Sequence, residues 1–212
     1  MPVMQIDEVK KVLEDLYDGV KGTIISCSER SRENITSSTY VYGEAELHSI
    51  EKIFQIVDPQ PDEVFVDLGA GVGKQVLTAA LLYDFKKVRG IEILSDLHKT
   101  SKDILEQFRK KYGSKLPDGK EMPDIDFLKG NFLRADFSEA DVAYMCSTCY
   151  SEEMMEGIAR GAEHMKPGSR VVTLTKPLPS DQYEEIHHEF YPMSWGTSQV
   201  FIYKKKDINE EK

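Results

Sequence analysis

The sequence Val64-Phe-Val-Asp-Leu-Gly-Ala-Gly-Val-Gly-Lys74 decides the fold class of this chain. It begins with an apolar run of β-branched and aromatic residues, which suits a buried strand. Gly69, Gly71 and Gly73 follow Asp67 and allow a tight turn in which the backbone comes close to a ligand. The next residues predict a helix, so the glycines precede a helix N-terminus, where nucleotide-type cofactors bind in open α/β sheets.

The spacing of these glycines separates two kinds of cofactor. The pattern is G-x-G-x-G rather than the G-x-G-x-x-G of dinucleotide-binding proteins, and it favours S-adenosylmethionine (SAM) over a nicotinamide cofactor. Glu92 lies near the end of the next predicted strand, Val88–Ile93, where its carboxylate can accept hydrogen bonds from both ribose hydroxyls. SAM and NAD both carry this diol, so Glu92 does not separate them. A plain strand–helix connection and a solvated glutamate are the alternatives.

A third predicted strand begins at Asp124 and runs into Asn131. In SAM enzymes a polar residue at this place commonly meets the adenine amino group, and an adjacent apolar residue packs on the ring. Asn131 and Phe132 suit these two tasks, although Asn after Gly is also an ordinary turn.

The remaining sequence alternates helices and strands and ends in strands with no helix between them. Helical spacing predicts helices over Val9–Val20 and Leu47–Val57, and the polar stretch Ser26–Ser38 is predicted to be a linker or mobile loop. Later elements are expected as a helix over Ser95–Tyr112, a loop over Gly113–Pro123, a strand over Asp141–Cys146, a helix over Glu152–Met165, and strands over Arg170–Thr175, Glu184–Tyr191 and Ser198–Lys204. The last two strands should pair antiparallel.

This pattern predicts an α/β fold with a Rossmann-like class I methyltransferase sheet, mostly parallel with an antiparallel C-terminal strand and helices on both faces. We divide the chain into an N-terminal helix and polar linker (residues 1–38), a SAM-dependent methyltransferase domain (39–205) and a polar tail (206–212).

The composition of the chain indicates the cellular compartment in which the protein is expected. The 212 residues include 40% hydrophobic and 30% charged residues, which is ordinary for a globular protein. No apolar stretch is long enough to span a bilayer, and the N-terminus lacks the features of a signal peptide. Three cysteines imply no disulfide framework. We therefore expect an intracellular protein, nuclear or cytoplasmic, with no membrane association.

The formal net charge of −10 argues against nucleic-acid binding by this chain alone, because phosphate binding needs clustered Lys and Arg. The one basic neighbourhood, Lys99–Lys120, is diluted by Asp103, Glu106 and Asp118 and is predicted to be a solvated helix face and a loop. An acidic surface instead suits a basic protein partner.

Several motifs together resemble a known family. They are Tyr42-Gly-Glu44, the glycine motif, Gly90-Ile-Glu92, Gly130-Asn-Phe-Leu133, Met165-Lys-Pro-Gly-Ser-Arg-Val-Val172, Thr175-Lys-Pro177 and Ser194-Trp195. They appear in the order found in the disruptor-of-telomeric-silencing methyltransferases, which modify a lysine in the globular core of a histone. The resemblance covers roughly Thr36 to Tyr203. The glycine motif is generic to class I methyltransferases, whereas the Tyr-Gly-Glu and Lys-Pro motifs are more specific.

The resemblance implies methyl transfer from SAM to a protein lysine, with S-adenosylhomocysteine (SAH) as product. It implies that Glu44 reaches the ammonium of the SAM methionine moiety, with Asp67 and the glycine turn beneath it. It also implies that Glu92 holds the ribose. A partly buried carboxylate is costly unless it finds a cation, and this ammonium would supply one. A charge at a helix N-terminus is the alternative for Glu44.

The resemblance further implies that Asn131 and Phe132 hold the adenine, and it places Tyr42 and Cys146 in the cofactor site as well. Two departures from the family pattern concern the substrate. An Asn-Asn-Phe segment after the fourth strand is replaced here by Cys146–Tyr150, and Lys74 replaces a Gln. The given sequence also lacks the basic extension that helps the histone enzymes hold nucleosomal DNA, so these departures count against a histone in particular. The expected partner is a basic protein, of which a histone is one example.

Ser147, Tyr150 and Trp195 are the candidate catalytic residues, because the replaced segment should border the transferable methyl. Tyr150 and Trp195 would form walls of an acceptor channel, with core packing as the alternative. We expect Tyr150→Ala to reduce methyl transfer while SAM affinity stays within about threefold. Cys146 and Cys149 form a C-x-x-C pair that could bind metal or be redox-active. Small channel side chains are favoured, and no metal is expected.

Three other functions fit parts of the pattern. A methyltransferase of a small molecule or of another protein residue would share every cofactor motif. A SAM-binding module without catalysis would explain the missing Asn-Asn segment. A nicotinamide oxidoreductase is disfavoured by the glycine spacing and by the antiparallel finish of the sheet.

Overall fold

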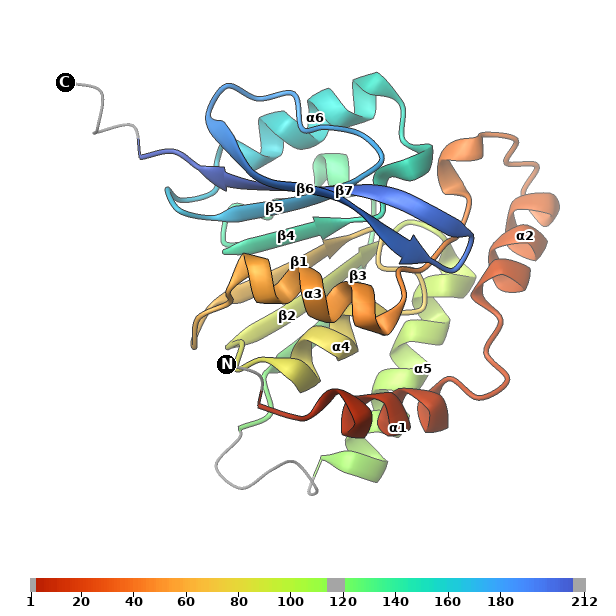
Figure 1. Ribbon diagram of the computed structural model, residues 1–212. Coiled ribbons are helices and arrows are strands. Elements are labelled where there is room, and N and C mark those ends of the chain that lie inside the picture. The colour runs from red at the N-terminus through yellow and green to blue at the C-terminus, as the bar shows by residue number, and fades with distance from the viewer. Residues whose placement is uncertain (1–2, 114–120, 208–212) are drawn as a thin grey trace.

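The computed structural model describes residues 3–113 and 121–207, and within them seven strands form one sheet in the order β3-β2-β1-β4-β5-β7-β6 (Figure 1). The strands are β1 (Val64–Leu68), β2 (Lys87–Glu92), β3 (Asp124–Lys129), β4 (Val142–Met145), β5 (Arg170–Leu174), β6 (Tyr183–Met193) and β7 (Gly196–Lys205). The first five pair in parallel, and β7 runs antiparallel to both β5 and β6. The predicted mostly parallel sheet and its antiparallel finish are confirmed.

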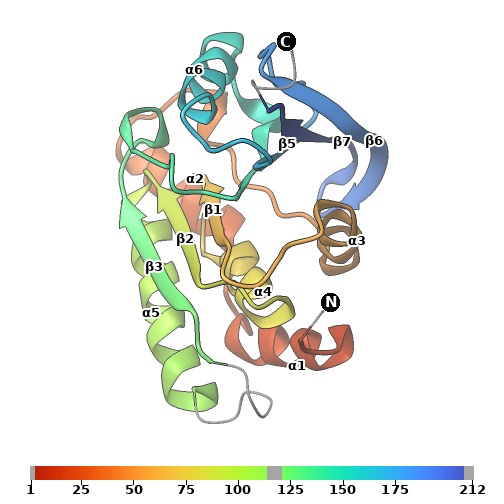
Figure 2. The same cartoon turned by 90° about the vertical axis from the view of Figure 1, so that its left-hand side faces the viewer.

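Helices cover both faces of this sheet (Figure 2). They are α1 (Ile6–Leu16), α2 (Gly22–Arg32), α3 (Leu47–Val57), α4 (Lys74–Leu82), α5 (Ser95–Tyr112) and α6 (Glu152–Ala162), with short 3-10 turns η1 (Ser38–Tyr40), η2 (Phe132–Arg134) and η3 (Ser147–Cys149). Apolar residues of α1, α3, α4 and α5 share one core with one side of the sheet, whereas α6 packs on a second core at the other side. Strand side chains alternate between the two cores, since Phe65 faces the first and Val66 the second.

The strand order creates a reversal at the centre of the sheet. From β1 the chain moves outward to β2 and β3, then returns to place β4 on the other side of β1. Connections therefore leave the carboxyl ends of β1 and β4 in opposite directions and open a crevice there. Ligands of open α/β sheets bind at such a switch point.

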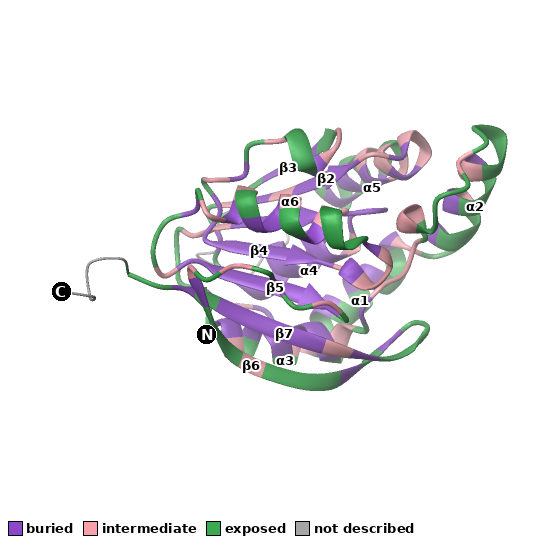
Figure 3. Ribbon diagram, turned by 90° about the horizontal axis from the view of Figure 1, so that it is seen from above, coloured by how far each residue is buried: buried purple, intermediate pink, exposed green. Residues whose placement is uncertain are grey.

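The prediction that Ser26–Ser38 is a linker or mobile loop is wrong, because α2 occupies Gly22–Arg32. Figure 3 shows exposed residues along much of α2, so little burial holds it in place. Hydrogen bonds to the start of α5 hold α2 in place instead. The buried carboxylate of Glu29 accepts hydrogen bonds from the backbone N–H groups of Ser95, at 2.6 Å, and Asp96, at 2.8 Å. Glu29 thus caps the first turn of α5 from a distant part of the chain.

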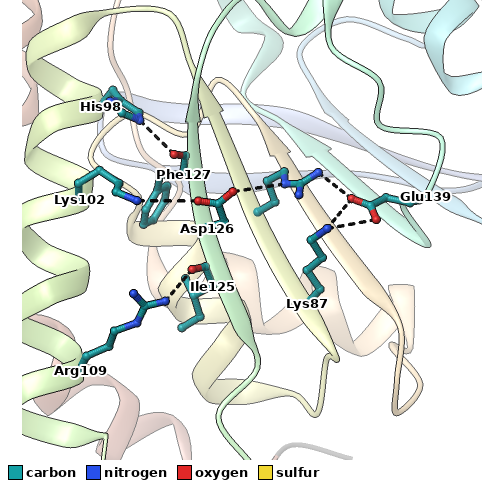
Figure 4. A network of polar contacts seen from close by, with 9 residues as sticks. Lys87, His98, Lys102, Arg109, Ile125, Asp126, Phe127 and Glu139 are labelled. Atoms are coloured by element: carbon teal, nitrogen blue, oxygen red, sulfur yellow. Dashed lines mark hydrogen bonds and ion pairs between the residues drawn. The ribbon is translucent and has the colours of Figure 1, made fainter.

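Side chains of α5 protect the free edge of the sheet at β3 (Figure 4). A ring nitrogen of His98 lies 3.1 Å from the carbonyl oxygen of Phe127, and Arg109 donates to the carbonyl of Ile125 at 2.9 Å. Lys102 lies 3.8 Å from the carboxylate of Asp126 on the same strand. The first two contacts occupy carbonyl groups that would otherwise be open to pairing with another chain.

Two expectations are limited by the described ranges. Residues 114–120 of the predicted loop and residues 208–212 of the predicted tail lie outside them. No helix within residues 3–113 and 121–207 is long and apolar enough to cross a membrane.

Candidate active site

The glycine turn joins β1 to α4 at the centre of the switch point. Gly69 and Gly71 have φ angles of +101° and +56°, a left-handed backbone that residues with a Cβ rarely adopt. A Cβ on Gly71 would lie 2.3 Å from the ring of Tyr42, so that ring packs directly on the turn. Gly73 precedes α4 and lies against Phe127, where a Cβ would be 2.4 Å from the ring. The predicted turn is present, and aromatic side chains press on it.

Glu92 ties the glycine turn to the end of β2. One of its carboxylate oxygens accepts from the N–H of Gly71 at 2.8 Å, and the other accepts from the N–H of Leu94 at 2.7 Å. Burial raises the pKa of this carboxyl, and backbone hydrogen bonds, chiefly those from Leu94 and Gly71, partly oppose the rise. A carboxylate has about four acceptor positions, so two remain for a ligand with two hydroxyl groups.

A cavity of about 190 Å³ opens beside Glu92. Its wall includes Asn131, Phe132, Tyr150 and Leu94, so polar acceptors and flat apolar surfaces face the same space. The rings of Phe132 and Tyr150 pack together with centroids 5.3 Å apart. The structure therefore brings together the residues predicted to bind ribose and adenine. The side-chain oxygen of Asn131 also accepts from the N–H of Leu133 at 2.9 Å, which fixes the direction of its amide.

Asp67 and Cys146 lie at the carboxyl ends of the two central strands. Asp67 is 2% exposed, and burial followed by the nearby charge of Glu92 raises its pKa well above the usual value. Burial and the charge of Asp67 raise the pKa of the Cys146 thiol to about 12. The thiol is thus protonated at neutral pH, which opposes a nucleophilic or redox role for the C-x-x-C pair. Among the described residues, no His, Cys, Asp and Glu side chains group as a metal site.

Glu44 has a different partner from the expected one. Its carboxylate lies 2.9 Å from the ammonium of Lys74 and also accepts a hydrogen bond from the hydroxyl of Tyr42. Lys74 in turn lies 5.7 Å from the centre of the Tyr17 ring. Glu44 thus has a cation within the chain, and its contact with the SAM ammonium stays a prediction.

Trp195 lies at the turn between β6 and β7, close to the Tyr42–Glu44 segment. The N–H of Ser194 donates to the carbonyl of Glu44 at 2.9 Å, and the hydroxyl of Ser194 accepts from the N–H of Glu44 at 3.1 Å. A Cβ on Gly43 would be 2.5 Å from the Trp195 ring, which is 41% exposed. Two motifs that are 150 positions apart are thus held side by side, and Tyr42 and Gly43 of the first also line the 190 Å³ cavity.

Ser147 does not face a channel. It is fully buried, and its hydroxyl donates to the carbonyl of Leu174 at 2.7 Å and accepts from the N–H of the same residue at 3.0 Å. These bonds fasten η3 to β5, and Ser147 is not among the residues that line the 190 Å³ cavity, so its catalytic role stays a prediction without support from this geometry. Tyr150 is also buried, and its hydroxyl donates to the carbonyl of Leu68 at 2.9 Å beneath the glycine turn. Its place is in the wall of the 190 Å³ cavity rather than in a separate channel.

An open groove of about 540 Å³ lies on the α1 side of the Glu44–Lys74 pair. Carboxylates outnumber amines in its wall, which contains Glu14, Asp18, Glu44 and Glu46 against Lys10 and Lys74. The hydroxyl of Tyr17, another residue of this wall, donates to the carbonyl of Val72 at 3.2 Å.

Sequence reasoning missed Tyr17, Glu29 and Tyr144 at or around the site. Tyr144 had a usable signal, since it lies two positions before Cys146 on a strand and therefore points to the same side of the sheet. Tyr17 and Glu29 had none, because both act on residues far along the chain: Tyr17 on Val72, and Glu29 on Ser95 and Asp96.

Comparison with known families and proteins gives a consistent result. The family model "Histone methylation protein DOT1" matches residues 22–194. A Dictyostelium discoideum protein named histone-lysine N-methyltransferase, H3 lysine-79 specific, is 29% identical over 204 residues, which cover 87% of this chain and 11% of that protein. A protein-lysine N-methyltransferase of Saccharolobus islandicus is 26% identical over 160 residues, which cover 76% of this chain and 83% of that protein.

The chain thus spans about a tenth of the length of the Dictyostelium relative and most of the length of the Saccharolobus one. Among solved structures, an RNA methyltransferase from Salinibacter ruber in complex with S-adenosyl-L-homocysteine has a TM-score of 0.56 and 20% sequence identity. The alignment covers 77% of this chain and 94% of that one. At this level of identity the likeness concerns the fold, and it confirms the predicted class I methyltransferase sheet.

Proposed function

We propose that this chain, which belongs to the DOT1 histone methylation family, transfers a methyl group from SAM to a lysine of a basic protein and releases SAH. The observation that carries the proposal is the convergence of Glu92, Phe132 and the glycine turn on one cavity at the switch point of the sheet. Ribose hydroxyls, an adenine ring and an amino-acid moiety each find complementary groups along this cavity. The family match supports the reaction type.

The residues present fit a nucleoside. Glu92 has two acceptor positions left after its backbone hydrogen bonds, which suits a ribose diol. Phe132 and Tyr150 give the flat apolar surface that an adenine ring needs, and Asn131 lies in the same wall. Tyr150 therefore belongs on the cofactor side in this proposal, and Tyr150→Ala should weaken SAM binding and methyl transfer together.

The chain's own contribution to the reaction is positioning and the exclusion of water. When bound, SAM supplies an electrophilic methyl group. Tyr150 and Cys146 have raised pKa values because they are buried, so they stay protonated at neutral pH and do not act as bases. The acceptor amine must then lose its proton to solvent, and apolar surroundings favour its neutral form. The exposed apolar side chains of Val41 and Trp195 near the mouth provide such surroundings.

A basic protein is the acceptor class that the charges favour. The chain carries a net charge of −10, and carboxylates dominate the groove beside Glu44. Potentials of opposite sign steer encounter and favour matching partners. A histone is one protein of this kind, and relatives such as the Dictyostelium enzyme are named for a histone lysine. A nuclear or cytoplasmic location fits such a substrate.

Duplex DNA is not expected to bind this chain by itself. Several cations of α5 already have internal partners, as Lys99 lies 2.8 Å from Asp103 and Lys111 lies 3.0 Å from Asp15. Along α5 these pairings leave few cations to neutralise several phosphates at once. Fluorescence anisotropy with a labelled duplex should show weak binding, and tight binding with a steep dependence on salt would contradict this.

Labelling with tritiated SAM tests the proposed reaction. The chain would be incubated with core histones and, separately, with a cell lysate, and the labelled residue identified by mass spectrometry. We expect label on a lysine of a basic protein and none with Glu92→Ala. Label that appears only in small molecules would favour the small-molecule alternative. SAH binding by calorimetry without any transfer would favour a non-catalytic SAM-binding module.

A further inference from the structure

The hydroxyl of Tyr144 is buried and has no hydrogen-bond partner within residues 3–113 and 121–207. Tyr144 lies on β4 and is 2% exposed. Among the residues that the structure describes, two other side chains have a buried polar atom without a partner, Arg30 and Arg89. Each of these is an arginine with another nitrogen that is bonded, to Cys27 and to Glu139 respectively. Tyr144 differs because its only polar side-chain atom is the unpaired one.

Tyr144 lines a small space that is part of the proposed site. A small cavity of about 20 Å³ is lined by Tyr144, Asp67, Glu44 and Lys74. Gly43, Gly69 and Cys146 line both this cavity and the 190 Å³ cavity beside Glu92, so the two adjoin at the glycine turn. The small cavity therefore extends the nucleoside cavity past the turn.

We propose that Tyr144 is a cofactor-positioning residue whose hydroxyl donates a hydrogen bond to the carboxylate of the cofactor's amino-acid moiety. This inference rests on the proposed function. If Glu92 and Phe132 hold the adenosine, the amino-acid moiety continues from the sugar toward the glycine turn and the small cavity. That moiety carries one ammonium and one carboxylate. Asp67 and Glu44 are acceptors for the ammonium, so the carboxylate needs donors.

Two residues that line the small cavity carry donors of the right kind, Tyr144 with its hydroxyl and Lys74 with its ammonium. The Tyr144 hydroxyl stays protonated, since burial raises its pKa and the charges of Cys146 and Asp67 raise it further. The Lys74 ammonium is already paired with Glu44 at 2.9 Å. Tyr144 is therefore the donor without an internal partner, which makes it the group that a ligand would satisfy.

The proposal predicts opposite effects of one substitution on the stability of the ligand-free protein and on its affinity for the ligand. A buried polar group without a partner destabilises the folded protein, and removing such a group is neutral or stabilising. Tyr144→Phe should thus keep or raise the melting temperature of the ligand-free protein. The same change removes a hydrogen bond to a charged acceptor in the complex, so affinity should fall by about tenfold or more. A residue with only a packing role would not produce opposite signs.

Calorimetry with two ligands tests the assignment on the full chain. SAH carries the amino-acid moiety, whereas 5′-methylthioadenosine has the same nucleoside and sulfur without it. Tyr144→Phe should weaken SAH about tenfold and leave 5′-methylthioadenosine within about twofold. Tyr183→Phe is the matched control, because that buried hydroxyl donates to the carbonyl of Ala162 at 2.8 Å, in the core beside α6. It should lower the melting temperature and leave both affinities unchanged.

Each other outcome contradicts a defined part of the inference. Equal weakening of both ligands by Tyr144→Phe would show a packing effect and overturn it, as would an unchanged affinity for SAH. Decarboxylated SAH, which keeps the amine, should be insensitive to Tyr144→Phe, and a tenfold loss with it would place the hydroxyl on the ammonium instead. A wild-type chain that binds neither nucleoside would overturn the proposed function itself, and this inference with it.

Discussion

The amino ends of the strands, here called the amino edge of the sheet, and the carboxyl ends, called the carboxyl edge, differ in how their charged groups are paired. At the amino ends of the strands, Arg170 lies 2.9 Å from a carboxylate oxygen of Glu63 and donates to the carbonyl of Val57 at 3.0 Å. At the same edge the buried carboxylate of Asp141 accepts from the N–H of Val64 at 2.9 Å and pairs with a lysine. These charged groups have their partners within the chain.

At the carboxyl ends of the same strands, like charges gather beside one unpaired donor. Burial and the charge of Glu92 raise the pKa of Asp67, and burial raises the pKa of Glu92. The Tyr144 hydroxyl lacks a partner there. Such an arrangement lowers stability unless a ligand completes it, which is the usual relation between binding sites and stability. One edge of the sheet stabilises the fold, and the other is arranged for a ligand.

The largest effect is expected at the amino edge, with Arg170→Met. This change leaves the Glu63 carboxylate and the Val57 carbonyl without their partner in a buried place. Breaking a buried ion pair by removing one member costs about 3–5 kcal/mol. Urea unfolding should show this loss, and the double variant Glu63→Gln with Arg170→Met should recover part of it. A loss under about 1 kcal/mol would mean that the amino edge does not stabilise the fold in this way.

Next in size is Glu92→Ala at the carboxyl edge. It removes a charged acceptor for two ribose hydroxyls, each hydrogen bond being worth roughly 1.5–3 kcal/mol, so SAH affinity should fall at least about tenfold. Calorimetry on protein shown to be folded by circular dichroism measures this. Gly71 and Leu94 lose their acceptor too, so the melting temperature of each sample has to be compared. An unchanged dissociation constant would contradict the cofactor assignment.

Ser147→Ala tests the comparison at the carboxyl edge. Ser147 lies there, and yet its hydroxyl already has a donor and an acceptor in the backbone of Leu174. Its replacement should therefore affect stability rather than ligand binding, as for the residues of the amino edge. We expect a loss of about 1–2 kcal/mol in the free energy of unfolding and an unchanged affinity for SAH. A tenfold loss of affinity with unchanged stability would restore Ser147 to the site.

The smallest effect is expected for Asp67→Asn, with the opposite sign. The raised pKa of Asp67 means that the folded protein holds a proton that the unfolded chain has already released. Stability from this proton is complete below about pH 4, the usual aspartate value, and is lost as the pH rises through the folded pKa. The neutral amide avoids this loss, so Asp67→Asn should gain on the order of 1 kcal/mol at neutral pH.

Urea unfolding from pH 4 to pH 8 checks this sign. The advantage of Asp67→Asn over the wild type should grow with pH and vanish near the acid end. Asp141→Asn is the matched control, because it weakens the satisfied aspartate of the other edge and should lower stability at pH 7. A destabilised Asp67→Asn at pH 7 would show that Asp67 is also satisfied within the chain.

The fold could be predicted because its determinants are local. The apolar run Val64–Val66, the glycines and the strands β2 to β5 each have a pattern that the neighbouring residues fix. The same holds for Glu92, whose position after a strand follows from the chain order. The carboxyl ends of neighbouring parallel strands lie together, so the residues that line the cavity beside Glu92 could be grouped from the sequence.

The features that could not be predicted depend on contacts between residues far apart in the chain. Helix α2 has a weak apolar pattern, with Ile24 57% exposed, and it is held by Glu29 through residues more than sixty positions away. Whether Ser147 faces a channel or β5 depends on how η3 lies against the sheet, which no local pattern gives. The partner of Glu44 is an ammonium 30 positions later. Pairings between separate elements are the part that one sequence does not reveal.

The cap that Glu29 places on α5 also has a consequence for how the chain acquires its structure during synthesis. The N–H groups that hold Glu29 are made 66 and 67 positions after it, so α2 leaves the ribosome long before its attachment exists. Its glycine, threonine and serines are weak helix formers, and a helix of 11 residues is marginal in water by itself. In a nascent chain that ends before Ser95, the amides of α2 should therefore exchange with solvent as freely as those of an unfolded segment.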